Sequence, residues 1–457
     1  MSKLVQRKVA ASTTRGGPKA RKPGGKRPAN APVFEVVIEA LAPGGAGLAH
    51  GPRGAVFVDR VAPGDRVRVS AISRDRAELV LVLQAGPDRV EPPCIFASRC
   101  GGCDWMHLSR PVQGAAHRDQ VAGMLAHALG YEVDVRALEP PAWERSRTRA
   151  RLHAEARGSK VDVGYRAARS HSLAMVDDCL VLERELYDAV REAMSWARSA
   201  KGSGDVSVAW GQRVSDDARA PVVDVAWKGE LPAEFWARAD RACADGAFAG
   251  VRVTLDGARA ATSVGDPRPV QRGFDGAPIR LRAGGFAQAS DDGAALLARE
   301  VVALAAPEGR DVLELFSGSG TLSVALAQNA ARFTSLELDA DAVVCARENF
   351  VRRGLSGKLG VGDAEQSTVS PAHDVVVLDP PRRGAPQAIA AIAKSRPRVV
   401  VYVACDPASL ARDAKVLAAA GYTLDSAATL GLFPFTSHVE TVARFVKRPP
   451  RAARAPS

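Results

Sequence analysis

The sequence has little cysteine and no long apolar run. Its seven cysteines are an odd number, and no secretory signal precedes them, so we expect reduced thiols, metal ligands or a nucleophile rather than disulfides. The longest apolar runs, such as Val399–Ala404, are the length of a strand and fall far short of the ~20 residues that a membrane span needs. With 46% hydrophobic residues, the chain is expected to be a soluble, cytoplasmic and monomeric protein without membrane segments.

Acidic residues are absent from both ends of the chain. Residues 1–32 carry nine Lys or Arg and residues 447–457 carry four, whereas the rest is nearly balanced, with 49 basic and 51 acidic side chains. Such tails cannot bury a core, so we expect them to be disordered and either to contact RNA phosphates or to serve as solubilisers. The first residues also fit a transit peptide, although they lack the apolar core of a secretory signal.

Between the tails, composition and periodicity divide the chain into three parts. Residues 33–90 predict a small OB-like β-barrel, because glycines and prolines separate four short strand-like runs: Phe34–Ile38, Ala55–Val58, Arg66–Ile72 and Glu78–Leu83. Residues 91–270 predict a central α+β domain, which begins with a cysteine cluster and a helix carrying Val121, Met124, Leu125 and Leu129 at helical spacing.

Residues 271–446 alternate between strand and helix patterns. Four runs are strand-like: Val312–Phe316, Phe333–Leu338, Val375–Leu378 and Arg398–Ala404. Helical runs separate them, and a further strand is expected from Glu440 to Val446. Such alternation is typical of a parallel, doubly wound α/β sheet.

Four cysteines form a candidate metal site. Cys94, Cys100 and Cys103 have C-x5-C-x2-C spacing, with two glycines that permit a tight turn, and Cys179 follows much later. Four thiolates suit structural zinc or an iron–sulfur cluster, and the spacing alone slightly favours zinc. The spacing differs from the C-x3-C-x2-C of radical S-adenosylmethionine enzymes, which argues against radical chemistry.

A glycine loop after the first of these strands predicts a nucleotide-type cofactor site. Gly318 and Gly320 lie between this strand and a helix, where the backbone can approach a ligand closely. Glu337 ends the next strand and can accept hydrogen bonds from both ribose hydroxyls of an adenosine. Ser323 replaces the third glycine of a dinucleotide fingerprint, which disfavours an NAD-dependent oxidoreductase. Glu314 is either a second carboxylate for a cationic cofactor or a solvated or salt-bridged residue.

The strongest candidate nucleophile follows the apolar strand Val399–Ala404. Cys405 lies between this strand and a helix that Asp406 and Pro407 are suited to begin, so the helix dipole favours a thiolate there, although Asp406 opposes it. Cys243 and Cys345 lack such a setting and are interpreted as packing residues. Glu440 alone would be interpreted as a charge on an edge strand.

Together these motifs resemble the RNA uridine-5 methyltransferases. The run from Gly44 to Val69 resembles a TRAM domain, and the likeness is strongest to the TRAM-containing, iron–sulfur subfamily that modifies 23S ribosomal RNA. The resemblance implies a class I methyltransferase domain that uses S-adenosylmethionine, with Cys405 as nucleophile and Glu440 as base. It implies a four-iron, four-sulfur cluster on the four cysteines, in place of zinc. It also implies a cofactor site containing Gln288, Phe316, Thr321, Glu337, Asp363 and Asp379.

Several positions depart from the usual family pattern. Glu314 and Asp406 replace Asp and Asn, Ser290 replaces Asn, and Met106 replaces Gln. In the last motif, Gly431 replaces an acid and Phe435 a polar residue. Alternative hypotheses are the same reaction on a transfer RNA uridine, or a non-catalytic iron–sulfur assembly factor that binds RNA.

Overall fold

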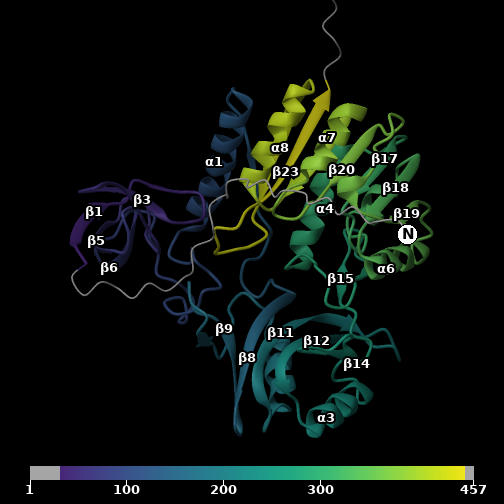
Figure 1. The fold of residues 1–457 in the computed structure, drawn as a ribbon, viewed down its shortest axis with the longest axis horizontal. Helices are drawn as coiled ribbons and strands as arrows, with labels where there is room; N and C mark the ends of the chain where they lie inside the picture. The colour runs from purple at the N-terminus through teal and green to yellow at the C-terminus, as the bar shows by residue number, and fades with distance from the viewer. Residues whose placement is uncertain (1–30, 448–457) are drawn as a thin grey trace, which may run out of the picture.

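The computed structural model describes residues 31–447 of the chain. In Figure 1 the N-terminal sheet lies at the left, the central sheet at the bottom, and a C-terminal α/β layer at the upper right. Nearly all of the two basic tails lies outside the described residues, and so does the predicted disorder. Within residues 31–447, no helix is long and apolar enough to cross a membrane.

The N-terminal part is a six-stranded sheet in the order β1-β5-β6-β4-β3-β2. Contacts between β1 and β3 bring its two sides together around a valine-rich core that includes Val58, Val67 and Val69. The four strands expected from the sequence are present, and two short strands had been missed: β2 and β3. The strands are β1 (Val33–Val37), β2 (Ala40–Leu41), β3 (Gly47–Gly51), β4 (Gly54–Val58), β5 (Arg66–Ala71) and β6 (Arg76–Gln84).

The central part is a seven-stranded sheet in the order β10-β9-β8-β11-β12-β13-β14. Two helices, α2 (Arg184–Ser195) and α3 (Ala233–Ala244), pack on it around a core that contains Trp196, Trp227 and Phe235. The strands are β8 (Arg149–Arg157), β9 (Lys160–Arg166), β10 (Leu173–Met175), β11 (Lys201–Gln212), β12 (Arg219–Glu230), β13 (Gly250–Leu255) and β14 (Thr262–Gly265). A small ladder of β15 (Val270–Arg272) and β16 (Pro278–Arg280) follows.

The C-terminal part is an eight-stranded sheet in the order β19-β18-β17-β20-β21-β23-β22-β7. Its first five strands are parallel, as predicted for four of them, whereas β19 had been missed; β23 runs antiparallel to both of its neighbours. The strands are β17 (Asp311–Leu315), β18 (Arg332–Glu337), β19 (Lys358–Val361), β20 (Val375–Leu378), β21 (Val399–Ala404), β22 (Tyr422–Leu430) and β23 (Glu440–Lys447).

Helices cover both faces of this sheet, as a doubly wound fold requires. One face packs against α4 (Asp291–Ala305), α5 (Ser323–Leu326) and α6 (Ala340–Val351). The other packs against α1 (Arg110–Leu129), α7 (Pro386–Ser395) and α8 (Pro407–Ala419). A short 3-10 turn, η1 (Ala364–Gln366), follows β19.

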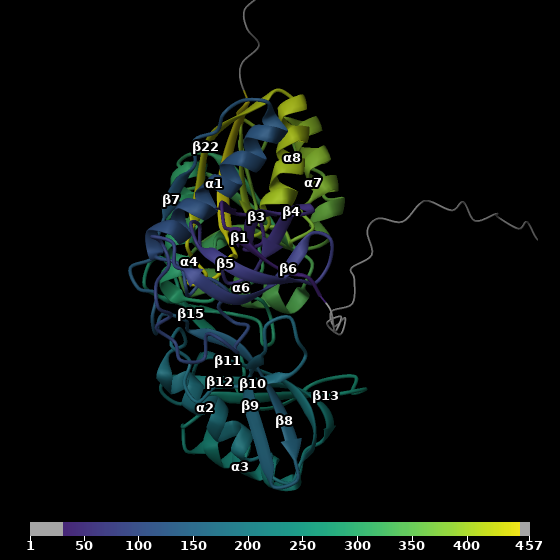
Figure 2. The same cartoon turned by 90° about the vertical axis from the view of Figure 1, so that its left-hand side faces the viewer.

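Residues 110–138 differ from the domain division expected from the sequence, which placed them in the central domain. The predicted helix α1 is present, but its buried Val121 and Leu125 face the core shared with α8. The next strand, β7 (Arg136–Leu138), pairs in parallel with β22 and forms the edge of the eight-stranded sheet. Figure 2 shows α1 beside α8, with the N-terminal sheet in front of this layer. Helix α1 and strand β7 therefore belong to the C-terminal part of the fold, although they precede the central part in the sequence.

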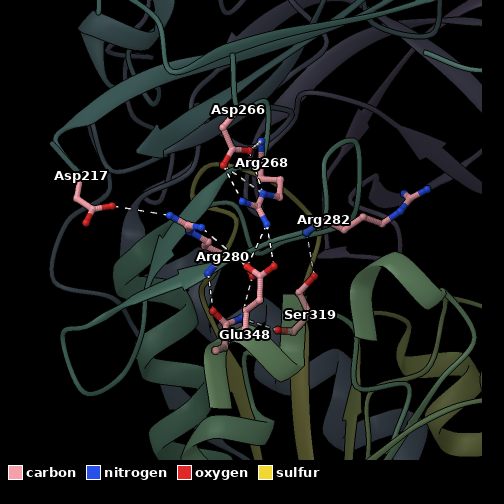
Figure 3. Close-up of polar contacts among 8 residues, drawn as sticks. Asp217, Asp266, Arg268, Arg280, Arg282, Ser319 and Glu348 are labelled. Atoms are coloured by element: carbon pink, nitrogen blue, oxygen red, sulfur yellow. Dashed lines mark hydrogen bonds and ion pairs between the residues drawn. The ribbon is translucent and has the colours of Figure 1, made fainter. Parts of the chain in front are cut away.

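A polar network joins the central part to the C-terminal sheet (Figure 3). Arg268, between β14 and β15, forms a salt bridge with Glu348 on α6 at 3.0 Å. The next residue, Asn349, is fully buried, and its amide group donates to the carbonyls of Arg280 at 2.8 Å and Ser319 at 2.9 Å. Because Ser319 belongs to the glycine loop, this network fixes the loop relative to the linker between the two parts.

Candidate active site

The sheet places Cys405 and Glu440 opposite each other. The antiparallel β21–β23 ladder ends with Ala404 opposite Thr441, so the next facing positions are Cys405 and Glu440. Cys405 also precedes α8, where the side chain of Asp406 accepts a hydrogen bond from the backbone of Ala408. The predicted position between strand end and helix start is confirmed.

Glu440 is buried rather than exposed on an edge. Its strand β23 lies between β21 and β22, and its side chain is only 3% exposed. Burial and the neighbouring Asp379 carboxyl raise the pKa of Glu440 well above its usual value, and the Arg382 guanidinium opposes this. Burial also raises the pKa of Asp379 to about 7. The interpretation of Glu440 as an edge charge is therefore wrong.

The expected thiolate character of Cys405 is not found in the resting site. Burial, followed by the carboxyl groups of Glu440 and Asp379, raises the pKa of Cys405 to about 11, whereas Arg382 lowers it. Asp406, which the sequence suggested as the opposing charge, is not among these causes. Burial, together with two carboxyls from distant segments, therefore outweighs the favourable start of α8, and the resting side chain is a thiol.

The glycine loop after β17 forms a strained turn that is held by Glu337. Phe316 has a φ of 63°, a left-handed conformation that is costly for a residue with a Cβ and is common at functional sites. Glu337 accepts hydrogen bonds from the backbone of Gly318 at 2.9 Å and of Asp339 at 2.9 Å. A Cβ added at Gly318 would meet no protein atom within 4 Å, so this part of the loop is open for a ligand.

The other predicted cofactor residues lie near the same sheet edge. Gln288 is buried beside α4, and its Oε1 has no hydrogen-bond partner in the structure, which suits a side chain that awaits a ligand. Asp363 follows β19 and begins η1 by accepting a hydrogen bond from the backbone of Glu365. Asp379 follows β20, and Thr321 is half-buried beside Gly320. Thr321, Asp363 and Asp379 follow the carboxyl ends of β17, β19 and β20, where open α/β sheets bind ligands, whereas Gln288 lies between β16 and α4.

Glu314 and Ser323 form a buried pair beneath the loop. The Ser323 hydroxyl donates to the Glu314 carboxyl at 2.5 Å, and both side chains are almost fully buried. Burial raises the pKa of Glu314 to about 8, and the Ser323 hydrogen bond opposes this shift. A solvated or salt-bridged Glu314, one of the two sequence-based hypotheses, does not describe this arrangement, whereas a carboxylate that faces a cationic cofactor stays a prediction. Ser323 had been noted only as a missing glycine, and its hydrogen bond to Glu314 was missed.

The two departures in the last motif, Gly431 and Phe435, have local explanations. A Cβ at Gly431 would lie 2.2 Å from a carboxyl oxygen of Glu139, so an acid from another segment already occupies that space. Phe435 packs its ring edge-on against Trp143, with centroids 5.1 Å apart, inside the central core. Met106 belongs to the same core and leaves no polar group to satisfy.

The four predicted metal ligands line one small cavity. Cys94, Cys100, Cys103 and Cys179 surround about 40 Å³ of space together with apolar side chains, Tyr165 and Arg147. The Tyr165 hydroxyl donates to the Cys179 sulfur at 3.4 Å, and burial raises the pKa of Cys103 to about 12. Over the described part of the chain, no group of three or more His, Cys, Asp or Glu is arranged to hold a metal ion. Cys243 and Cys345 pack in cores, as expected.

Arg382 is a site residue to which the sequence analysis gave no role, although it stands in the Asp379-Pro-Pro-Arg382 run. Its guanidinium lowers the pKa values of both Cys405 and Glu440 and lies 3.4 Å from Nδ1 of His438. It is the cation that favours the charged forms of nucleophile and base.

Comparison with known proteins supports this arrangement. Family profiles described as "Methyltransferase small domain" and "tRNA (Uracil-5-)-methyltransferase" match residues 277–396 and 369–448. The 23S rRNA (uracil(1939)-C(5))-methyltransferase RlmD of Pseudomonas putida is 33% identical over 390 residues, 81% of this chain and 83% of that protein. Its namesake from Pseudomonas entomophila is 32% identical over 455 residues, 94% of this chain and 98% of that protein.

A solved structure shares the fold. The Pyrococcus abyssi tRNA (uracil-54, C5)-methyltransferase in complex with S-adenosyl-L-homocysteine matches with a TM-score of 0.70 and 23% identity, over 90% of this chain and 100% of that chain. The sequence relatives share more than 30% identity over most of both lengths, and this shows the family. The chain belongs to the S-adenosylmethionine-dependent RNA (uracil-C5)-methyltransferases.

Proposed function

We propose that this protein methylates C5 of a uridine in 23S ribosomal RNA, at the position equivalent to the one named for its RlmD relatives. The observation that carries the proposal is the pairing of Cys405 with the buried Glu440 across β21 and β23, beside the cofactor edge of the sheet. A nucleophile and a base on adjacent strands suit a reaction that begins and ends at neighbouring carbons of one ring. Acting on ribosomal RNA places the protein in the cytoplasm.

The chemistry assigns one step to each residue. Cys405 gives up its proton to solvent, and its sulfur adds to C6 of uracil, which breaks the C5–C6 double bond and leaves an enolate with a nucleophilic C5. S-adenosylmethionine would supply the methyl group that C5 takes up, with S-adenosylhomocysteine as the leaving group. The Glu440 carboxylate removes the hydrogen from C5, the double bond re-forms, and the C6–sulfur bond breaks. Because burial raises the pKa values of both Cys405 and Glu440, Arg382 has the role of favouring their charged forms.

Residues at the strand ends would hold S-adenosylmethionine. Glu337 would accept hydrogen bonds from the ribose hydroxyls, and the backbone between Phe316 and Thr321, including Gly318 and Gly320, would lie against the ligand. Gln288 offers its unpartnered Oε1, while Asp363 and Asp379 line the site. The pKa of Asp379, raised to about 7, should fall when a cation binds beside it.

A cleft between the central sheet and the C-terminal part is the proposed path for RNA. It encloses about 250 Å³, and its lining includes Arg147, Arg149 and Arg151 together with the rings of Phe286 and Phe433. Phe433 belongs to the loop that leads into Glu440, so this cleft borders the catalytic residues. Arginines bind phosphate and aromatic rings stack on exposed bases, which suits a uridine turned out of its helix. The N-terminal sheet, with its TRAM-like sequence, would add a second RNA contact.

The four-cysteine cavity is proposed to hold a four-iron, four-sulfur cluster. Its donors are four thiols from two distant segments, and thiolates are the usual ligands of such clusters. A bound cluster would tie the segment of Cys94 to that of Cys179. Anaerobically purified protein should then contain about four irons and four sulfides per chain. Stoichiometric zinc without sulfide would contradict this assignment.

The substrate is tested by methyl transfer in vitro. Purified protein and labelled S-adenosylmethionine are offered a 23S ribosomal RNA fragment spanning the relatives' target uridine, the same fragment with that uridine changed to cytidine, and unmodified transfer RNA. We expect 5-methyluridine in the first RNA alone, mapped by mass spectrometry. Methylation of transfer RNA and not of the fragment would assign the protein to the other substrate class.

A further inference from the structure

The residue that follows the last clustered cysteine holds the loop that leads to the candidate base. Asp104 comes directly after Cys103, and its Oδ1 accepts a hydrogen bond from the backbone N–H of Ser437 at 2.9 Å. Ser437 is three residues before Glu440. We call residues 431–439 the catalytic loop, since they connect β22 to Glu440 at the start of β23.

Trp105 adds a second link between the same two segments. Its backbone N–H donates to the carbonyl of Phe435 at 2.9 Å, and its indole Nε1 donates to the carbonyl of Gly45 in the N-terminal sheet at 3.0 Å. A Cβ added at Gly45 would lie only 2.5 Å from the Cβ of Ser437, so the sheet also approaches the catalytic loop closely. The cysteine segment, the N-terminal sheet and the catalytic loop therefore meet at Asp104 and Trp105.

The remaining contacts make this junction rigid. His117 of α1 stacks on Trp105 with ring centroids 4.8 Å apart, and its Nε2 lies 3.1 Å from the carbonyl of Thr436. Phe435 has a φ of 63°, which a phenylalanine keeps only when its surroundings impose it. The contacts of the catalytic loop with its surroundings thus stabilise a backbone conformation that would be unfavourable in an isolated segment.

Among the described residues, the Asp104 carboxylate has no ion-pair partner that would explain its presence at this position. Within residues 31–447 its carboxylate forms no salt bridge with a lysine or arginine, and the hydrogen bond that it accepts comes from the backbone N–H of Ser437.

We propose that Asp104 is a positioning residue, which sets the catalytic loop so that Glu440 lies against the C5 hydrogen of the bound uridine. The proposal rests on the proposed function. Proton removal by a base depends steeply on geometry, so a small displacement of the loop slows the step that Glu440 performs. Addition by Cys405 is independent of this link, because Cys405 is held by β21 and α8.

The test moves the acceptor without removing it. Asp104→Glu keeps the charge but displaces the oxygens by one methylene, whereas Asp104→Asn keeps an oxygen in place and loses the charge. Asp119→Glu, on the exposed side of α1, is the matched control, since its partner is the surface residue Arg118. We measure kcat, the KM values for RNA and S-adenosylmethionine, and the fraction of enzyme trapped in a denaturation-resistant RNA adduct.

We expect Asp104→Glu to lower kcat about tenfold, the size of one strong hydrogen bond, with KM values unchanged and with more adduct than wild type. Asp104→Asn and Asp119→Glu should stay within about twofold of wild type. A wild-type kcat for Asp104→Glu would overturn the proposal. Equal losses in Asp104→Glu and Asp104→Asn, without extra adduct, would also overturn it and show a merely structural role. If the proposed function itself were wrong, wild-type protein would transfer no methyl group to uridine, a result that these variants cannot produce.

Discussion

The cofactor end and the catalytic end of this site are held in different ways. The cofactor loop takes its shape from its neighbours in the sheet, since Glu337 of the next strand binds the backbone of Gly318. The catalytic loop is fixed by segments more than 290 residues away, through contacts of Ser437 and Thr436 with Asp104 and His117. Changes at the cofactor end should therefore affect binding, whereas changes at the catalytic end should affect turnover.

The largest effect is expected from Cys405→Ala. Without the sulfur, C5 of uracil stays too poor a nucleophile, so kcat should fall by at least about 10³-fold and no protein–RNA adduct should form. Binding of S-adenosylmethionine, measured by calorimetry, should be unchanged. Cys243→Ala, a half-buried packing cysteine, serves as the control. Normal turnover of Cys405→Ala would remove the nucleophile assignment.

Glu440→Gln should come next. The amide cannot accept the C5 hydrogen, so kcat should fall about 10²-fold or more while addition and methyl transfer still proceed. A methylated adduct should therefore accumulate, visible as a denaturation-resistant band that carries label from the methyl group. Its formation should require both S-adenosylmethionine and the target uridine. Normal turnover without adduct would mean that another group is the base.

A smaller effect, on cofactor binding rather than on turnover, is expected from Glu337→Gln. The carboxylate accepts from Gly318 and Asp339, and its loss should loosen the loop and weaken the ribose contacts. The KM for S-adenosylmethionine should rise about tenfold with little change in kcat. Glu308→Gln, an exposed carboxylate on the same part of the fold, is the matched control. A fall in kcat at constant KM would erase the distinction between the two ends.

The smallest effect concerns stability. Burial raises the pKa of Glu314 to about 8 from 4.5, so the folded state binds the proton more tightly than the unfolded state. This contribution is complete below pH 4.5 and is lost as pH rises toward about 8. The Glu314→Gln variant has no titrating group at this position and does not lose this stability. The difference between its melting temperature and that of wild type should therefore shift by roughly a few degrees in favour of the variant as pH rises across this range. A pH-independent difference between the two proteins would show that Glu314 is not protonated in the folded state.

The same contrast decides what the sequence could predict. The cofactor end follows local rules: strand, glycine loop and acid at the next strand end were all predicted at Val312–Thr321 and Glu337. The start of α8 at Asp406 and Pro407 was equally local. The raised pKa of Cys405 was not predicted, because it depends first on burial and then on the carboxyls of Glu440 and Asp379, which come from other segments.

Long-range pairing explains the remaining differences. The three residues of β7 are too few to show an alternation of hydrophobic and polar side chains. The sequence therefore does not predict that they pair with β22, almost 300 residues later. The burial of Glu440 depends in the same way on the insertion of β23 between β21 and β22. The role of Asp104 required its distance to Ser437, which no spacing in the sequence encodes.

The most direct test of the central claim follows the hydrogen at C5. The 23S ribosomal RNA fragment is prepared with tritium at C5 of its uridines and is incubated with the protein and S-adenosylmethionine carrying a ¹⁴C-labelled methyl group. The account predicts that one tritium is released to water for each methyl group that the RNA gains, and that Cys405→Ala releases none. Methyl transfer without tritium release would mean that the methyl group goes to another atom, and would contradict the account.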